Sequence, residues 1–287
     1  MIIDGRKLQK KIVDEIKAID FIQSKIVGFW VGDDENTRKF LSQKEKVARM
    51  LDVEFEIKRL PLDVSQDDLE YAVRSSFFTI FVGGIIVQLP LPGQIDTRKV
   101  LVNIGRYKDI DCLGPECEST FYDNPISAVI APPSVGAVKS ILKDINFEDL
   151  NGKKIVLLGY GGLIGRPVAA WLKAKGFDFL VFRSDSAVDL EKMRERDLAL
   201  KEADLIIAGV GGGRLKITGD MIKSGAVVID FGPDVDWKSI DGAGGIVTST
   251  PGGTGPVLVA ELFRNFAILK DKSKFDKPHD VYIRKTP

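Results

Sequence analysis

An aromatic residue and a lysine four positions apart place their side chains on one face of a predicted helix. They are Phe40 and Lys44, in a segment with helical periodicity over residues 36–51. Burial of that face would favour the neutral amine of Lys44, because desolvation penalises an ammonium ion. A neutral lysine can accept a proton from an attacking water, whereas a protonated one stabilises developing negative charge. A lone lysine on a helix is more often a solvated surface charge, so this interpretation needs support from other segments.

Two further polar residues could complete such a site. Gln88 ends an apolar segment just before a proline-rich turn, and its amide oxygen can hold the head group of Lys44. Asp111 can accept hydrogen bonds from an amino group and a ring N–H, although it could also be a turn residue before Gly114. The only histidine is His279, near the C-terminal end of the sequence. A mechanism that uses histidine as its acid or base is therefore not expected.

A glycine-rich turn connects a predicted strand at 154–158 to a predicted helix at 167–175. Glycines there allow a tight turn and let a pyrophosphate approach the helix N-terminus, where N–H groups and the helix dipole favour anions. The match to the G-x-G-x-x-G pattern is incomplete, because Ile164 stands where the last glycine would fall. A tight turn without a ligand is the alternative. The candidate cofactor-binding residues of the turn are Gly159, Tyr160, Gly161, Gly162, Leu163, Ile164 and Gly165.

The end of the next predicted strand, at 179–182, decides how a ribose would be recognised. An acidic residue there binds the 2′-hydroxyl of NAD, whereas an arginine accepts the 2′-phosphate of NADP. Arg183 and Ser184 favour NADP, while Asp185 leaves NAD open. A solvated pair of loop charges is the alternative. After a later predicted strand, Gly232 and Pro233 are also candidate cofactor-binding residues.

Four separated segments carry a specific combination of motifs. They are Val31-Gly32-Asp33 followed by Phe40 and Lys44, VQLPLP at 87–92, KDID at 108–111, and TPGGTGP at 250–256. Together with the glycine-rich turn, they resemble the methylenetetrahydrofolate dehydrogenase/cyclohydrolase family over nearly the whole chain. The resemblance implies oxidation of 5,10-methylenetetrahydrofolate to 5,10-methenyltetrahydrofolate with NADP, followed by hydrolysis to 10-formyltetrahydrofolate. It also implies a cleft between two domains and a homodimer built through the second domain.

The resemblance implies roles for individual residues as well. Lys44 matches the catalytic lysine, Gln88 its glutamine partner, and Asp111 the aspartate that binds the pterin. No metal ligand is implied. The expected substrate-binding residues are Phe40, Leu89, Pro251, Gly252 and Gly253.

The sequence departs from the family pattern at several positions. The aromatic residue before the lysine is usually tyrosine, and Phe40 lacks its hydroxyl. This weakens the expectation of hydrolysis more than that of hydride transfer, which needs mainly positioning. Cys112 replaces a usual glycine, and Pro132-Pro133-Ser134-Val135 replaces a stretch usually like PCTP. Tyr160-Gly161 replaces a common Arg-Ser pair, whose contact with a 2′-phosphate Arg183 could restore.

Three other functions remain open from the sequence. The first is a dehydrogenase with little cyclohydrolase activity, which Phe40 motivates. The second is a nucleotide-binding regulatory protein without turnover, although the presence of Lys44, Gln88 and Asp111 argues against it. The third is a different two-domain dehydrogenase resembling shikimate dehydrogenase, against which the VQLPLP and PGGTGP motifs argue.

The periodicity along the chain predicts an α/β fold with two domains. Helices alternate with short apolar strands, which favours parallel βαβ units and a Rossmann-like second domain after a boundary near 125–136. There, Ser134 could cap a helix that runs to Leu142. We expect a folate-binding domain over 1–130 plus 257–287 and an NAD(P)-binding domain over 131–256, with the last helix returning to the first domain. The predicted strands span 25–32, 53–59, 84–88, 154–158, 179–182, 205–210 and 226–231. The other predicted helices span 8–19, 36–51, 66–74 and 257–269.

Composition narrows the partners and the location. With 287 residues, of which 44% are hydrophobic, the chain can bury the cores of two domains. Basic and acidic residues number 41 each, so charge gives no reason to expect a nucleic-acid or membrane partner. Cys112 and Cys117 form neither a disulfide framework nor a zinc site, which favours reduced thiols and a cytoplasmic location. No signal peptide or membrane-spanning segment is expected.

Overall fold

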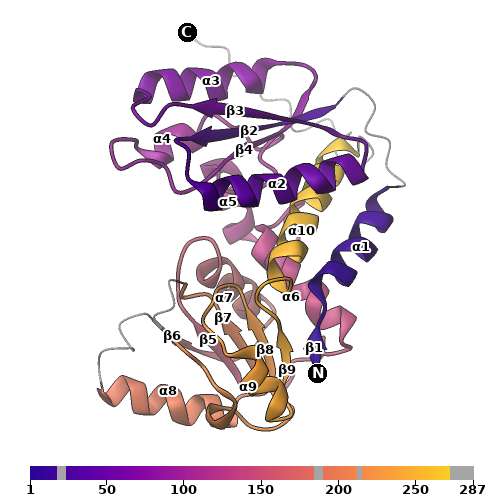
Figure 1. The fold of residues 1–287 in the computed structure, drawn as a ribbon, viewed down its shortest axis with the longest axis vertical. Coiled ribbons are helices and arrows are strands. Elements are labelled where there is room, and N and C mark those ends of the chain that lie inside the picture. The colour runs from indigo at the N-terminus through magenta and orange to yellow at the C-terminus, as the bar shows by residue number, and fades with distance from the viewer. Residues whose placement is uncertain (18–23, 184–189, 212–214, 272–287) are drawn as a thin grey trace.

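Two parallel sheets organise the chain in this computed structural model, which describes residues 1–17, 24–183, 190–211 and 215–271. A three-stranded sheet has the order β3-β2-β4, and a six-stranded sheet has the order β1-β9-β8-β7-β5-β6. Figure 1 shows the smaller sheet at the top and the larger one at the bottom, with α10 running between them. The two-domain α/β fold predicted from the sequence is confirmed.

In the first sheet, β2 lies between the other two strands. The chain moves from β2 through one helix to β3, and then through a second helix to β4 on the other side. Such a reversal of direction leaves a crevice at the carboxyl ends of the strands, where ligands bind in open α/β sheets. Asp34 and Ser65 cap the two helices through bonds from the backbone N–H groups of Thr37 and Asp68. The elements are β2 (Lys25–Val31), α2 (Glu35–Met50), β3 (Glu54–Leu60), α3 (Gln66–Phe78) and β4 (Val82–Val87).

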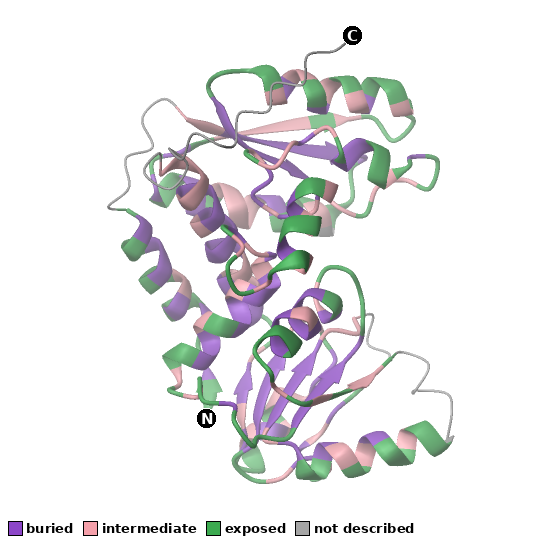
Figure 2. Ribbon diagram, turned by 180° about the vertical axis from the view of Figure 1, so that it is seen from behind, coloured by how far each residue is buried: buried purple, intermediate pink, exposed green. Residues whose placement is uncertain are grey.

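The second sheet also reverses direction, at β5. Its neighbours β6 and β7 lie on opposite sides of it, so the glycine-rich turn that follows β5 opens at the switch point. The three central strands are buried along their whole length, as Figure 2 shows. The strands are β5 (Ile155–Leu158), β6 (Phe179–Phe182), β7 (Leu205–Ala208), β8 (Val227–Asp230), β9 (Ile246–Thr248) and β1 (Ile2–Ile3).

Strands β1 and β9 are absent from the sequence prediction. Ile2 pairs with Val247, so the N-terminus of the chain extends the sheet of the second domain. Two- and three-residue strands are too short to give a periodic pattern.

The helix before the glycine-rich turn begins earlier than predicted. It is α6 (Pro133–Asp144), with Pro132 at the N-cap, so the prediction that Ser134 caps it is wrong. Proline suits the first turn of a helix, because its fixed φ and missing N–H cost nothing there. The hydroxyl of Ser134 donates instead to the carbonyl oxygen of Leu163, at 2.8 Å. The remaining helices around this sheet are α7 (Gly165–Ala174), α8 (Leu190–Glu202), α9 (Trp237–Gly242) and a 3₁₀ turn (Gly219–Met221).

Helix α10 (Thr254–Lys270) takes part in two hydrophobic cores. Near its start, Val257 and Ala260 pack with strands of the large sheet. Near its end, Phe263 and Phe266 pack with residues of α2, β2 and β4. The last elements are α1 (Gly5–Ile16), α4 (Thr97–Leu101) and α5 (Pro115–Asp123). No helix in the described ranges is long and apolar enough to span a membrane.

The expectation of reduced cysteines is wrong for this structure. Cys112 and Cys117 form a disulfide, with Cα atoms 5.2 Å apart. Cys112 has φ 54°, in the left-handed region, and Cys117 lies in the first turns of α5. The tight turn after Asp111 therefore brings the two side chains together.

Candidate active site

Three polar side chains from separate segments meet beside the end of β4. The side-chain nitrogen of Lys44 donates to Gln88 Oε1 at 3.1 Å and lies 3.9 Å from Asp111 Oδ2. The side chains of Lys44 and Asp111 are 12% and 20% exposed. All three predicted catalytic residues are thus in one partly buried cluster.

The end of β4 fixes the orientation of Gln88. Its backbone N–H donates to the carbonyl oxygen of Phe29 on β2, at 2.9 Å. Its side-chain Nε2 donates to the carbonyl oxygen of Leu89 at 3.0 Å, which leaves Oε1 for Lys44. The amide therefore acts as an acceptor that holds the lysine head group in place.

The surroundings of Asp111 favour a ligand that donates hydrogen bonds to its carboxylate. Burial raises the pKa of its carboxyl group, and the nearby Lys44 partly opposes this. A ligand that presents N–H groups would restore the hydrogen bonds that the carboxylate loses on leaving water.

A second aspartate, which the sequence analysis missed, shapes the segment around Asp111. Asp109 is fully buried, and its carboxylate accepts bonds from the backbone N–H groups of Leu113 (3.2 Å) and Gly114 (2.7 Å). Burial raises its pKa to about 7. Asp109 therefore ties the turn after Asp111; the KDID motif at 108–111 includes this residue, but the sequence assigned it no role.

Phe40 and Leu89 flank this cluster along the chain. The ring of Phe40 is 53% exposed, four residues before Lys44 on α2. Leu89 packs partly against the core of the first domain, and the Leu89–Pro90 peptide bond is cis. An exposed aromatic ring near a partly buried lysine offers a flat ligand a surface for stacking.

The predicted loop at Pro251–Gly253 leads directly into α10. Gly252 has φ 102°, a conformation that favours glycine. The backbone of Gly253 packs so closely against Gly5 of α1 that a side chain at Gly5 would overlap it. Gln9, one turn further along α1, donates to the carbonyl oxygen of Pro256 at 2.8 Å. Helix α1 therefore packs against this loop and against the first turn of α10.

Two buried aspartates, also missed from the sequence, support Gly232 and Pro233. Asp230 accepts from the N–H of Gly232 at 2.9 Å and from the hydroxyl of Thr250 at 3.3 Å, and burial raises its pKa to about 7. Asp234 accepts from the N–H groups of Val210 (3.0 Å) and Gly211 (2.9 Å). Asp234 therefore joins the segments that follow β7 and β8, and Asp230 joins the end of β8 to Thr250, just before the Pro251–Gly253 loop.

The glycine-rich turn has both tight and open positions. Gly159 has φ 89°, and a side chain at Gly165 would overlap its carbonyl oxygen. Nothing lies within 4 Å of where a Cβ would stand on Gly161 or Gly162. Ile164 stands in place of the last glycine of the motif. Its side chain has room because it packs against a glycine, Gly209, just after β7.

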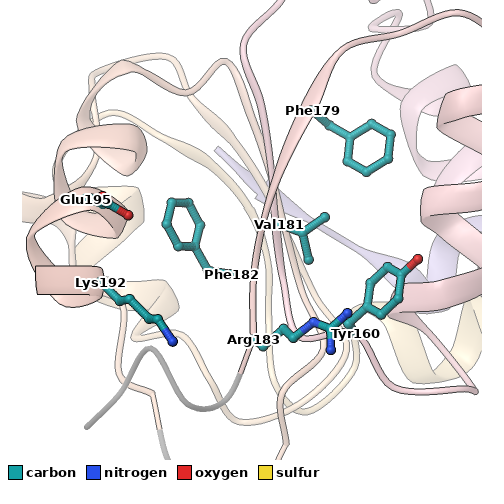
Figure 3. A pocket seen from close by; sticks show the side chains of 7 residues that line it. All are labelled: Tyr160, Phe179, Val181, Phe182, Arg183, Lys192 and Glu195. Atoms are coloured by element: carbon teal, nitrogen blue, oxygen red, sulfur yellow. The ribbon is translucent and has the colours of Figure 1, made fainter. Parts of the chain in front are cut away.

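A pocket of about 460 Å³ lies beside β6 and next to this turn (Figure 3). The guanidinium of Arg183 stacks on the ring of Tyr160, with 5.0 Å between them. Lys192 lines the same pocket, so two cationic side chains adjoin it. Tyr160 and Arg183 are thus together, whereas Leu163 is exposed nearby. Ser184 and Asp185 lie outside the described residues.

Comparison with known proteins gives a consistent result along the chain. Residues 3–111 match the catalytic domain of the tetrahydrofolate dehydrogenase/cyclohydrolase family, and residues 132–274 match its NAD(P)-binding domain. The bifunctional protein FolD of Geotalea uraniireducens is 33% identical over 283 residues, covering 92% of this chain and 96% of that protein.

Two solved structures are similar over almost their full length. The bifunctional methylenetetrahydrofolate dehydrogenase/cyclohydrolase of Campylobacter jejuni has a TM-score of 0.85 at 26% identity, covering 95% of this chain and 99% of that one. The corresponding Trypanosoma brucei enzyme, complexed with NADP cofactor and inhibitor, has the same TM-score and identity, covering 95% and 98%.

Proposed function

The chain belongs to the tetrahydrofolate dehydrogenase/cyclohydrolase family, and we propose that it oxidises 5,10-methylenetetrahydrofolate with NADP and hydrolyses the methenyl product to 10-formyltetrahydrofolate. One observation carries this proposal. Lys44, Gln88 and Asp111 come from three separate segments, yet Lys44 Nζ lies 3.1 Å from the amide oxygen and 3.9 Å from the carboxylate.

Asp111 would bind the pterin. Its carboxylate accepts hydrogen bonds from the amino group and ring N–H of the substrate, which offset the cost of its burial. The exposed ring of Phe40 stacks on the substrate. Leu89 and the loop at 251–253 complete its surroundings.

The glycine-rich turn fits a dinucleotide. The space at Gly161 and Gly162, which a side chain would fill, lets a pyrophosphate approach the backbone at the start of α7. Arg183 would pair with the 2′-phosphate, which favours NADP over NAD. When bound, the nicotinamide supplies the acceptor for the hydride that leaves the methylene carbon.

Lys44 would serve the hydrolytic step. Water adds to the methenyl carbon, and Lys44 Nζ, acting as the neutral amine, takes one of its protons while Gln88 Oε1 holds the amine in place. The bond from this carbon to ring nitrogen N5 then breaks, and the second proton of the water ends on N5. Asp111 is occupied by the pterin in this step, which leaves Lys44 as the base.

Incubation with 5,10-methylenetetrahydrofolate and NADP tests the proposed activities. We expect methenyltetrahydrofolate to form only when the cofactor is present, and then to decay to 10-formyltetrahydrofolate faster than without protein. A chain that binds NADP and folate but forms no methenyl product would contradict the proposal.

A dehydrogenase with weak cyclohydrolase activity is the second candidate, and Phe40 favours it. If the missing hydroxyl limits hydrolysis, then Phe40→Tyr should raise the rate of methenyltetrahydrofolate hydrolysis and leave hydride transfer nearly unchanged. The control is Phe78→Tyr, which changes another exposed phenylalanine on α3. Equal hydrolysis rates in the parent protein and both variants would show that the missing hydroxyl does not limit hydrolysis.

We assign the folate-binding unit to 1–130 plus 257–287 and the NAD(P)-binding unit to 131–256, with β1 as a strand that crosses this division. We also propose a homodimer built through the second domain. Among the described residues β6 is an edge strand of the large sheet, and Leu180 on it is 55% exposed, which supports such an interface. Sedimentation velocity would measure the mass, and a monomer at micromolar concentration would contradict the assembly.

A further inference from the structure

Asn265 is a buried polar residue in α10, only 7% exposed. Its side-chain Nδ2 donates to the carbonyl oxygen of Ile110 at 2.9 Å and to that of Ala131 at 2.8 Å. Both partners are acceptors, which fixes the orientation of the amide, because only its nitrogen carries two N–H donors. The residue therefore satisfies two backbone carbonyls at once.

Both carbonyls lie at positions that matter for the candidate site. Ile110 immediately precedes Asp111, and Ala131 lies at the boundary between the two domains, one residue before the family match to the NAD(P)-binding domain begins. Other anchors of the Asp111 segment come from the first domain. Asp109 ties the following turn, and the N–H of Ile85 on β4 donates to the backbone carbonyl oxygen of Lys108 at 2.7 Å. Asn265 instead joins the segment to a helix that starts in the other half of the molecule.

The first turn of the same helix is tied to the second domain. The hydroxyl of Thr254 donates to the carbonyl oxygen of Asp230 at 2.6 Å, directly after the Pro251–Gly253 loop. Asn265 is eleven positions after Thr254, which corresponds to roughly 16 Å along a helix. Helix α10 therefore acts as a spacer between that loop and the segment carrying Asp111.

We propose that Asn265 is a positioning residue that fixes the Asp111 carboxylate relative to the Pro251–Gly253 loop. The inference rests on the proposed function, in which Asp111 binds the pterin. Asn265 touches neither substrate nor cofactor in this account, and it acts only through the backbone of Ile110.

A double-mutant cycle separates positioning from general stability. Asn265→Ala should raise both the Kd for tetrahydrofolate and the KM for the methylene substrate by roughly tenfold, because a small displacement of a binding group is costly. The Kd for NADP should stay within about twofold. In an Asp111→Ala background, Asn265→Ala should change the folate Kd by less than about twofold, because the group it positions is already gone.

Ser140→Ala provides the matched control. It removes another polar contact of α10, the 2.7 Å bond from Ser140 to Glu261, which is not part of the candidate site. It should lower the Tm without changing the folate Kd. If Asn265→Ala behaves like this control, or if its loss of folate affinity is as large without Asp111 as with it, positioning is contradicted.

The binding measurement also distinguishes this inference from the proposed function. A parent protein that binds tetrahydrofolate but produces no methenyl product would contradict the proposed activity, while the cycle would still report on Asn265. A parent protein that binds no tetrahydrofolate would contradict both.

Discussion

At the scale of single residues, the surroundings of each group in the candidate site determine its role. Asp111 is a carboxylate whose pKa burial raises, so it suits a ligand that donates hydrogen bonds. Lys44 is held by a neutral amide on one side and faces Asp111 on the other. Once the ligand engages Asp111, the amine of Lys44 is the group left to handle a proton.

Arg183 gives a prediction about cofactor choice. Arg183→Ala should weaken NADP binding by roughly tenfold or more, because a guanidinium–phosphate pair is a strong charge-assisted interaction. The affinity for NAD should stay nearly unchanged, since NAD has no 2′-phosphate. Calorimetric titration with both cofactors measures this, and Lys173→Ala on α7 controls for the loss of one positive charge. Equal losses for NADP and NAD would show that Arg183 does not read the phosphate.

At the scale of elements, the strongly periodic segments were predictable. The strand β2 and helix α2 lie within one or two residues of their predicted bounds, because apolar spacing reports directly on burial. The short strands β1 and β9 were missed, since pairing with distant strands stabilises them rather than any local pattern.

The candidate site shows the same limit. Lys44, Gln88 and Asp111 stand in recognisable motifs, and the structure brings them together. Asp109 and Asp234 were missed, because their partners are backbone N–H groups whose positions depend on the folded turns. Ser134 was misassigned for a similar reason, since its acceptor at Leu163 is 29 residues away along the chain.

Replacing a glycine of the glycine-rich turn by alanine should have different effects at two positions. Gly165→Ala should lower the Tm and weaken NADP binding, because its side chain would overlap the backbone at Gly159. Gly161→Ala should leave the free energy of unfolding within about 0.5 kcal/mol of the parent, since nothing lies near its Cβ. It should still weaken NADP binding, because the methyl group takes the space of the pyrophosphate. Thermal unfolding and cofactor titration test both variants. An unchanged NADP affinity in Gly161→Ala would contradict the proposed pyrophosphate-binding site at this turn.

The end of β8 predicts a pH dependence of stability. Burial raises the pKa of Asp230 from 3.8 to about 7, so between these pH values the native state holds a proton that the unfolded chain has lost. Stability therefore falls as pH rises through this window. A raised pKa of this size corresponds to a penalty of up to about 4 kcal/mol above pH 7.

Asp230→Asn should remove that penalty. The asparagine oxygen can still accept from Gly232, and its nitrogen can donate to Thr250, whose hydroxyl can turn to the carbonyl oxygen of Gly232 at 3.2 Å. The Tm of the variant should exceed that of the parent by a margin that grows from pH 5 to pH 8. Asp178→Asn, at an exposed position, controls for the removal of one carboxylate. A difference in Tm that stays constant or shrinks over this pH range would show that Asp230 does not cause the pH dependence of stability.

At the scale of the whole molecule, the chain crosses between its two halves more than once. Strand β1 joins the large sheet, α1 then packs against α10, and α10 contributes to both hydrophobic cores. The Pro251–Gly253 loop and the Lys44 cluster are thus attached to a common framework. Such a framework supports one site that serves hydride transfer and hydrolysis in sequence.

The central claim is that Lys44 serves the hydrolysis, while positioning by the rest of the site suffices for hydride transfer. The most direct test measures both rates on purified Lys44→Met, which keeps most of the apolar stem and removes the amine. Lys39→Met, at a 65% exposed position on the same helix, is the matched control.

We predict that Lys44→Met loses cyclohydrolase activity by roughly 10²–10⁴-fold, as expected for removal of a general base. Its dehydrogenase activity should fall much less, and Lys39→Met should retain both activities. If Lys44→Met hydrolyses methenyltetrahydrofolate as fast as the parent protein while losing hydride transfer, the roles assigned to this site are wrong.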